Sequence, residues 1–138
     1  MLIILAHSKQ MAKWDGSWLF LGQDFIQMRK WEKRLPGKRI SLRERMLRQS
    51  SELRHPFLVW LENQRILRKD SLVWWMTQLA GRNVLVSHLY VHLCQIKAFL
   101  EFLQQKAPKF PETLLVVCED SFLFLAVQQI LKKQIQKQ

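Results

Sequence analysis

The sequence predicts an α/β fold, in which a small, Rossmann-like parallel sheet carries a large helical insertion. Residues 2–6 and residues 114–118 form two short, uninterrupted apolar runs, which are typical of parallel strands covered on both faces. The second run leads through an acidic turn into an amphipathic segment, and strand, turn and helix together make half of a parallel α/β unit. We therefore expect a single lobe over residues 1–138, with the helical insertion over about 41–106.

A further strand and a basic segment follow the first run. Asp15 and Gly16 give a turn signal, after which residues 17–21, SWLFL, predict a strand that ends at Gly22. Residues 23–40 are basic and lack a regular apolar pattern, and the Pro36-Gly37 pair should break any helix there. We expect this segment to be irregular.

The insertion is predicted to be helical from its capping signals and apolar spacing. Ser41 and Glu44 fit a capping box, in which each side chain satisfies a backbone amide near the other, and a helix over about 42–54 should follow. Its expected core-facing residues are Leu42, Met46, Leu47 and Leu53. Pro56 should either kink this helix or open a second one at its first turn.

Two more helices are expected before the last strand. Residues 72–80 form a short helix that ends at Gly81, which can adopt the left-handed conformation of a helix end. Ser87 can cap a longer helix that continues to about residue 105 and is apolar on most sides, so it should be largely buried. Its apolar stripe contains Leu89, Leu93, Ile96, Leu100 and Leu103, and is widened by Val91, Ala98, Phe99 and Phe102.

Neither a metal site nor a cofactor is predicted. Cys94 and Cys118 are too few and too far apart for a disulfide framework or a paired zinc motif, so both should be buried free thiols. His88 and His92 have a spacing that can bind a metal, but Cys94 lies two residues further on and should point to another face. The chain has no glycine-rich phosphate loop, so we expect no nucleotide cofactor.

The positive charge of the chain is concentrated in one segment. The formal net charge is +11, and residues 29–54 hold ten basic residues against three acidic ones. Such a segment either is a solvated basic face or binds anionic partners: phosphates, nucleic acid or an anionic lipid surface. The candidate anion-binding residues are Arg29, Lys30, Lys33, Arg34, Lys38, Arg39 and Arg43.

The apolar runs are too short for membrane insertion. The run over residues 2–6 is shorter than the apolar region of a signal peptide, and no run approaches the roughly 20 residues that span a bilayer. We expect a cytoplasmic protein, with association at the inner membrane surface left open.

Polar residues follow both of the apolar runs. If these runs form adjacent parallel strands, His7 and Ser8 meet Glu119 at the edge where open parallel sheets bind ligands. A carboxylate there can bind a sugar hydroxyl or act as a base. Asp120 and Ser121 have a simpler role as caps of a last helix, which runs from residue 122 to about 135.

Several segments resemble those of a family, the bacterial surface carbohydrate biosynthesis proteins, which are glycosyltransferase-like. The segment SLVWWMTQLAGRNVLVSHLYVHLCQIKAFLEFL is similar to a family block in which a WW pair precedes a turn with Asn and a serine-led helix. LLVVCEDSFLFLAVQQIL resembles the strand and helix that follow, and WDGSWLFLG and FLVWLEN resemble the upstream part. The residues that match are Trp74, Trp75, Gly81, Asn83, Ser87 and Glu119, and the likeness extends over about residues 1–135.

The resemblance implies the amino-terminal, Rossmann-like lobe of a two-lobed glycosyltransferase for surface polysaccharides. In such enzymes the carboxy-terminal lobe binds the nucleotide-sugar donor and the amino-terminal lobe shapes the acceptor site. The chain would then be an incomplete lobe without activity of its own, with Glu119, His7 and Ser8 contacting a carbohydrate acceptor. Trp75 either packs beneath a helix or presents its ring to stack on a sugar.

A second interpretation needs no enzyme. The chain can be a basic, non-enzymatic module that binds nucleic acid or a protein partner, with Trp31 among the cations of its basic segment. In the acceptor-lobe interpretation, residues 29–48 hold an anionic acceptor or lie against the inner membrane face. Nucleic-acid affinity that depends on phosphate contacts falls steeply with salt, whereas an acceptor lobe would show a cleft at the strand ends and no such affinity.

Overall fold

The computed structural model describes residues 3–7, 13–67, 88–106 and 113–135. The chain divides into two compact units: residues 1–42 together with 100–138 form the first, and residues 43–99 form the second. Ser8, Trp74, Trp75 and the helix predicted over 72–80 lie outside the described residues. The organisation as one lobe with an insertion stays a prediction.

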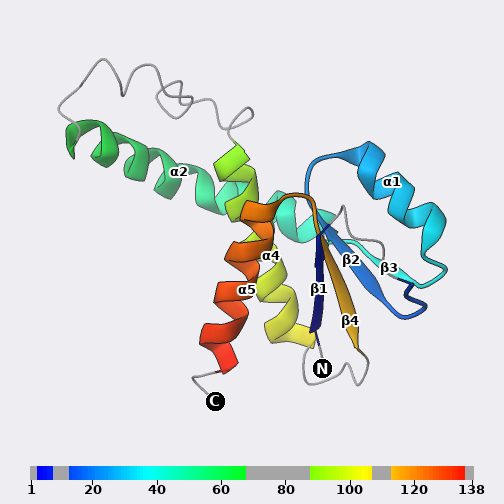
Figure 1. The fold of residues 1–138 in the computed structure, drawn as a ribbon. Coiled ribbons are helices and arrows are strands. Elements are labelled where there is room, and N and C mark those ends of the chain that lie inside the picture. The colour runs from blue at the N-terminus through cyan, green and yellow to red at the C-terminus, as the bar shows by residue number, and fades with distance from the viewer. Residues whose placement is uncertain (1–2, 8–12, 68–87, 107–112, 136–138) are drawn as a thin grey trace. The chain divides into compact units, whose positions relative to one another are not determined.

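A parallel sheet of four strands forms the centre of the first unit (Figure 1). Its strands are β1 (Ile3–His7), β2 (Trp18–Leu21), β3 (Arg39–Ile40) and β4 (Leu114–Cys118), in the spatial order β1-β4-β2-β3. All three neighbouring pairs are parallel. The α/β class and the three strands expected from apolar patterning are therefore confirmed.

The strand β4 lies between β1 and β2 and has five buried residues in succession. Its position explains the continuous apolar run, because a central strand of a parallel sheet is covered on both faces. Since side chains alternate along a strand, Leu115 and Val117 share one face, and they form a core cluster there with Trp31 and Leu35. Leu114, Val116 and Cys118 lie on the other face and are fully buried.

The expectation that residues 23–40 are irregular is wrong. This segment contains helix α1 (Phe25–Arg34) and strand β3. The Asp24 side chain begins α1 by accepting a hydrogen bond from the Gln27 amide at 2.9 Å. Trp31 is the only buried residue of α1, and the sequence of the helix is rich in charged residues. No row of buried apolar positions therefore marks this segment as a helix.

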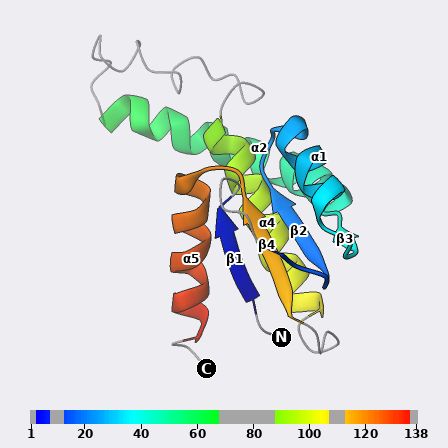
Figure 2. The same ribbon diagram turned by 45° about the vertical axis from the view of Figure 1, so that its right-hand side comes forward.

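The last helix, α5 (Ser121–Ile135), packs against β1 and β4. It lies on the side of the sheet opposite to α1 (Figures 1 and 2). α1 packs through Trp31 with Leu115 and Val117 of β4, whereas α5 packs on β1 and β4 from the other side. Asp120 caps α5, as predicted, by accepting a hydrogen bond from the Leu123 amide at 2.7 Å.

The second unit contains α2 (Arg43–Leu67) and most of α4 (His88–Lys106). α2 continues through Pro56 as one helix instead of ending near residue 54. Phe57 and Leu61 of α2 pack with Tyr90 and Cys94 of α4. The Tyr90 hydroxyl donates a hydrogen bond to the Ser50 carbonyl, which joins the two helices.

Two predicted core positions are wrong. Leu47 on α2 is 63% exposed and Leu93 on α4 is 41% exposed. In α4, Tyr90 and Cys94 take buried positions four residues apart in place of Leu93, whereas Leu103 is buried as predicted.

Candidate functional site

Three neighbouring strands end at the same level on one edge of the sheet, which we call the carboxyl edge. Cys118 at the end of β4 is in register with His7 of β1 and with Leu21 of β2. β2 connects through α1 to β3 on one side, while β4 lies on the other side of β2. The strand order therefore reverses between β2 and β4, and open α/β sheets bind ligands beyond such a point.

Glu119 lies at this reversal point and joins the loops that follow β2 and β4. Its Oε2 accepts hydrogen bonds from the backbone amides of Gln23 and Asp24, the latter at 3.1 Å. Its own amide donates to the Leu21 carbonyl at 2.8 Å. The carboxylate thus sits at the amino terminus of α1, where the helix dipole favours negative charge and where a bound phosphate would otherwise sit.

Gly22 permits this close contact between the two loops. A Cβ atom at Gly22 would lie 2.2 Å from Oε2 of Glu119 and 2.4 Å from Cβ of Glu119. Moving the carboxylate relieves only the first of these contacts, because the second involves an atom fixed to the backbone. The pairing of the loops therefore requires glycine at position 22.

The other two carboxylates at the edge, those of Asp24 and Asp120, cap the helices α1 and α5. Asp24 Oδ1 accepts from the Gln27 amide at 2.9 Å, and Asp120 Oδ1 accepts from the Leu123 amide at 2.7 Å. Each strand therefore leads into its helix through an aspartate that satisfies a free backbone amide. All three carboxylates of the carboxyl edge bind the chain's own backbone.

His7 and Ser121 form the polar side-chain contact that spans β1 and the start of α5. The Ser121 Oγ and the His7 Nε2 are 3.3 Å apart, and which of them donates depends on the tautomer of the imidazole. Ser121 is exposed and His7 is partly exposed, so a ligand approaching the edge can reach both. An imidazole nitrogen beside a hydroxyl can exchange hydrogen bonds with the hydroxyls of a sugar.

The Cys118 thiol below the edge is unsuited to nucleophilic chemistry at neutral pH. Burial, and to a smaller extent the charge of Asp120, raises the pKa of Cys118 from 9.0 to about 12. Since the thiolate is the reactive form, Cys118 stays protonated and inert. In the second unit, burial also raises the pKa of Cys94 and of Tyr90.

The predicted anion-binding residues of the first unit lie mainly on α1. Arg29, Lys30, Lys33 and Arg34 of this helix are exposed, as is Lys38 after it. Arg43 begins α2 and belongs to the second unit.

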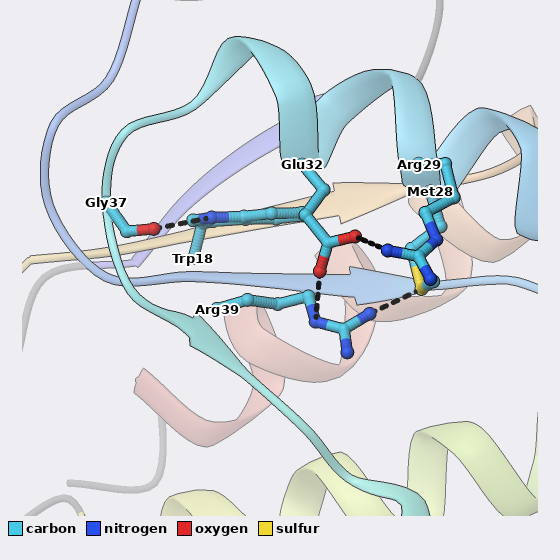
Figure 3. A network of polar contacts seen from close by, with 6 residues as sticks. All are labelled: Trp18, Met28, Arg29, Glu32, Gly37 and Arg39. Carbon is cyan, nitrogen blue, oxygen red and sulfur yellow. Dashed lines mark hydrogen bonds and ion pairs between the residues drawn. The ribbon is translucent and has the colours of Figure 1, made fainter.

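The single acidic residue of α1 is engaged by two arginines. Figure 3 shows Glu32 between Arg29, at 2.8 Å, and Arg39 of β3, at 3.5 Å. Arg39 also contacts the sulfur of Met28. Within the described part of the chain no ion pair involves Lys30, Lys33 or Lys38.

The structure brings together some of the predicted acceptor contacts. His7 meets Ser121, while Glu119 is turned towards the loop after β2. Ser8 and Trp75 lie outside the described residues, so their roles stay predictions. The backbone amides of residues 23 and 24 were not predicted as partners of Glu119. The spacing of Asp24 and Gln27 is typical of a helix start, but it does not indicate which side chain binds these amides.

The described residues contain no group of three or more His, Cys, Asp or Glu side chains placed to hold a metal ion. None of the described helices combines the length and the hydrophobicity needed to cross a membrane. Comparison with known proteins finds no matching family model, curated protein or solved structure.

Proposed function

We propose that the chain forms the acceptor-side lobe of a glycosyltransferase-like protein that assembles bacterial surface polysaccharide. The observation that carries the proposal is the contact of 3.3 Å between His7 and Ser121 at the carboxyl edge. It places an imidazole and a hydroxyl, both accessible, where open parallel sheets bind their ligands. The segments that resemble surface carbohydrate biosynthesis proteins support the same assignment.

The hydrogen bonds of Glu119 also support a lobe that binds the sugar acceptor over one that binds the nucleotide-sugar donor. In many α/β enzymes a phosphate of the nucleotide binds at the amino terminus of a helix after a strand. In this chain the carboxylate of Glu119 accepts from the amides of Gln23 and Asp24 at that position. A nucleotide-sugar phosphate would have to displace it, whereas a sugar acceptor at His7 and Ser121 would not.

The proposal is tested by NMR on the full chain labelled at its histidines. Acidic and neutral oligosaccharides from bacterial surface polysaccharides are titrated while the imidazole signals are followed. We expect the His7 signals to shift and those of His55, an exposed residue of α2, to stay unchanged. The variants His7→Ala and Ser121→Ala should each weaken binding about fivefold to tenfold, as the loss of one hydrogen bond predicts.

His55→Ala is the matched control and should bind as the wild type does. The proposal fails if no oligosaccharide shifts the His7 signals, or if His7→Ala and His55→Ala weaken binding equally.

The charge of α1 favours a second candidate function, a basic non-enzymatic module that binds nucleic acid or a protein partner. Four of its ten residues are basic and one is acidic. Binding of an oligonucleotide that falls steeply as salt is raised, without any response to oligosaccharides, would favour this module over the acceptor lobe.

A further inference from the structure

The exposed side of α1, which we call the outer face, consists of two rows of residues. One row is Phe25, Arg29 and Lys33, and the other is Ile26, Lys30 and Arg34. Residues four apart lie above one another on a helix, so each row starts with an apolar side chain and continues with two cations. All six residues are exposed. Trp31 lies on the other side of the helix, points to the sheet and is buried.

The two apolar side chains are largely exposed to solvent. Phe25 is 59% exposed and Ile26 is 68% exposed. The guanidinium of Arg29 lies 4.9 Å from the centre of the Phe25 ring, so cation and ring form one surface. Single exposed apolar residues are common, but two adjacent ones beside four cations make a combined apolar and cationic surface.

The one acidic residue of α1 does not offset the positive charge of this surface. Glu32 lies beside the outer face and is held by Arg29 and Arg39 in the network of Figure 3. Six basic residues, Arg29, Lys30, Lys33, Arg34, Lys38 and Arg39, occur within residues 29–39 with Glu32 as the only acid. Clusters of four to eight basic residues on an amphipathic helix are typical of contact with anionic lipid headgroups.

We propose that the outer face of α1 docks the protein on an anionic bilayer surface. The four cations contact lipid phosphates, and Phe25 and Ile26 enter the boundary between headgroups and acyl chains. A helix of ten residues is about 15 Å long, too short to span a bilayer, and lies in the plane of the interface. A nucleic acid would satisfy the cations but offers no apolar environment for Ile26, and for this reason we assign lipid as the partner.

This inference rests on residues separate from His7 and Ser121, so it stands or falls independently of the proposed acceptor site. The experiment measures cosedimentation of the full chain with phosphatidylcholine vesicles, with and without phosphatidylglycerol. We expect binding only to the anionic vesicles and a decrease of binding with salt. The double variant Lys30→Glu/Lys33→Glu should bind roughly 25-fold more weakly or worse, at about fivefold for each lysine near the surface.

Replacement of the apolar pair tests insertion separately from charge. Phe25→Ser/Ile26→Ser keeps every cation and should lower binding roughly tenfold, with a larger relative loss at high salt where the apolar contribution dominates. Helix α5 offers matched controls among its exposed residues: Lys132→Glu/Lys133→Glu for charge and Phe122→Ser/Leu125→Ser for apolar area. Circular dichroism establishes that every variant compared is folded.

The α5 controls should bind anionic vesicles within about twofold of the wild type, a difference of less than ~0.5 kcal/mol. The proposal is overturned if the chain ignores anionic vesicles, or if the α5 variants lose as much binding as the α1 variants. It is also overturned if an oligonucleotide displaces the vesicles and binds the Phe25→Ser/Ile26→Ser variant as tightly as the wild type, because the partner is then nucleic acid.

Discussion

The carboxyl edge of the sheet and the outer face of α1 carry opposite charges and use them in different ways. At the edge, Glu119, Asp24 and Asp120 all accept hydrogen bonds from backbone amides of the chain itself. On the outer face, Lys30 and Lys33 are exposed and form no ion pair within the described residues. The acidic charges hold the fold together, and the two lysines are available to a partner.

The difference shows why a cluster of charged residues does not by itself indicate a binding site. The edge has three carboxylates near the ends of neighbouring strands, and one of them, Glu119, is predicted from sequence to bind a ligand. In the structure these carboxylates are already satisfied, and the groups left accessible are the imidazole of His7 and the hydroxyl of Ser121. A carboxylate that already accepts hydrogen bonds from backbone amides is less able to bind a ligand.

The largest expected effect comes from adding a methyl group at the edge. Gly22→Ala should lower the free energy of unfolding by about 3 kcal/mol, because the new Cβ would lie 2.4 Å from Cβ of Glu119 and the loops would have to separate. Chemical denaturation measures the change. Glu119→Gly removes the second Cβ, so the double variant should lose much less than the sum of the two single losses; additive losses would show that the loops do not pack in this way.

The fold class could be predicted from sequence because its strands are locally evident. The run over Leu114–Cys118 is apolar and rich in β-branched residues, and it forms the fully buried central strand that such a run indicates. The candidate edge depends on β1 and β4 being adjacent and parallel, a condition that their apolar pattern does not establish and that the structure meets.

The parts that could not be predicted depend on contacts between distant segments. α1 has one buried residue among ten, so its composition resembles a loop more than a helix that packs on a sheet. β3 has two residues, and only its pairing with Trp18 and Leu19 makes it a strand. Glu119 meets amides 95 and 96 residues earlier in the chain, and no local pattern encodes that meeting.

The next largest effect should follow removal of the Glu119 side chain. Glu119→Ala leaves the amides of Gln23 and Asp24 without their acceptor and takes the negative charge from the start of α1, which should cost about 2 kcal/mol of unfolding free energy. Glu119→Gln keeps an acceptor oxygen and should cost about half as much. The double variant Lys30→Glu/Lys33→Glu on the outer face should stay within about 0.5 kcal/mol of the wild type. Equal losses of unfolding free energy in Glu119→Ala and in Lys30→Glu/Lys33→Glu would contradict the proposal that the carboxylate stabilises the fold while the lysines do not.

The smallest effect at neutral pH concerns the thiol beneath the edge, because its contribution to stability changes only above pH 9. Because burial raises the pKa of Cys118 from 9.0 to about 12, the folded chain keeps a proton that the unfolded chain releases as pH rises above 9. The stability contributed by the protonated thiol is therefore complete below pH 9 and is lost progressively between 9 and 12, by at most about 1.4 kcal/mol for each pH unit. Cys118→Val lacks this proton, so its unfolding free energy should fall less steeply than that of the wild type over the same range. Identical slopes for the two proteins, or rapid reaction of the Cys118 thiol with a disulfide reagent at pH 8 in the folded state, would show that solvent reaches the thiol beneath the carboxyl edge and that burial does not keep it protonated.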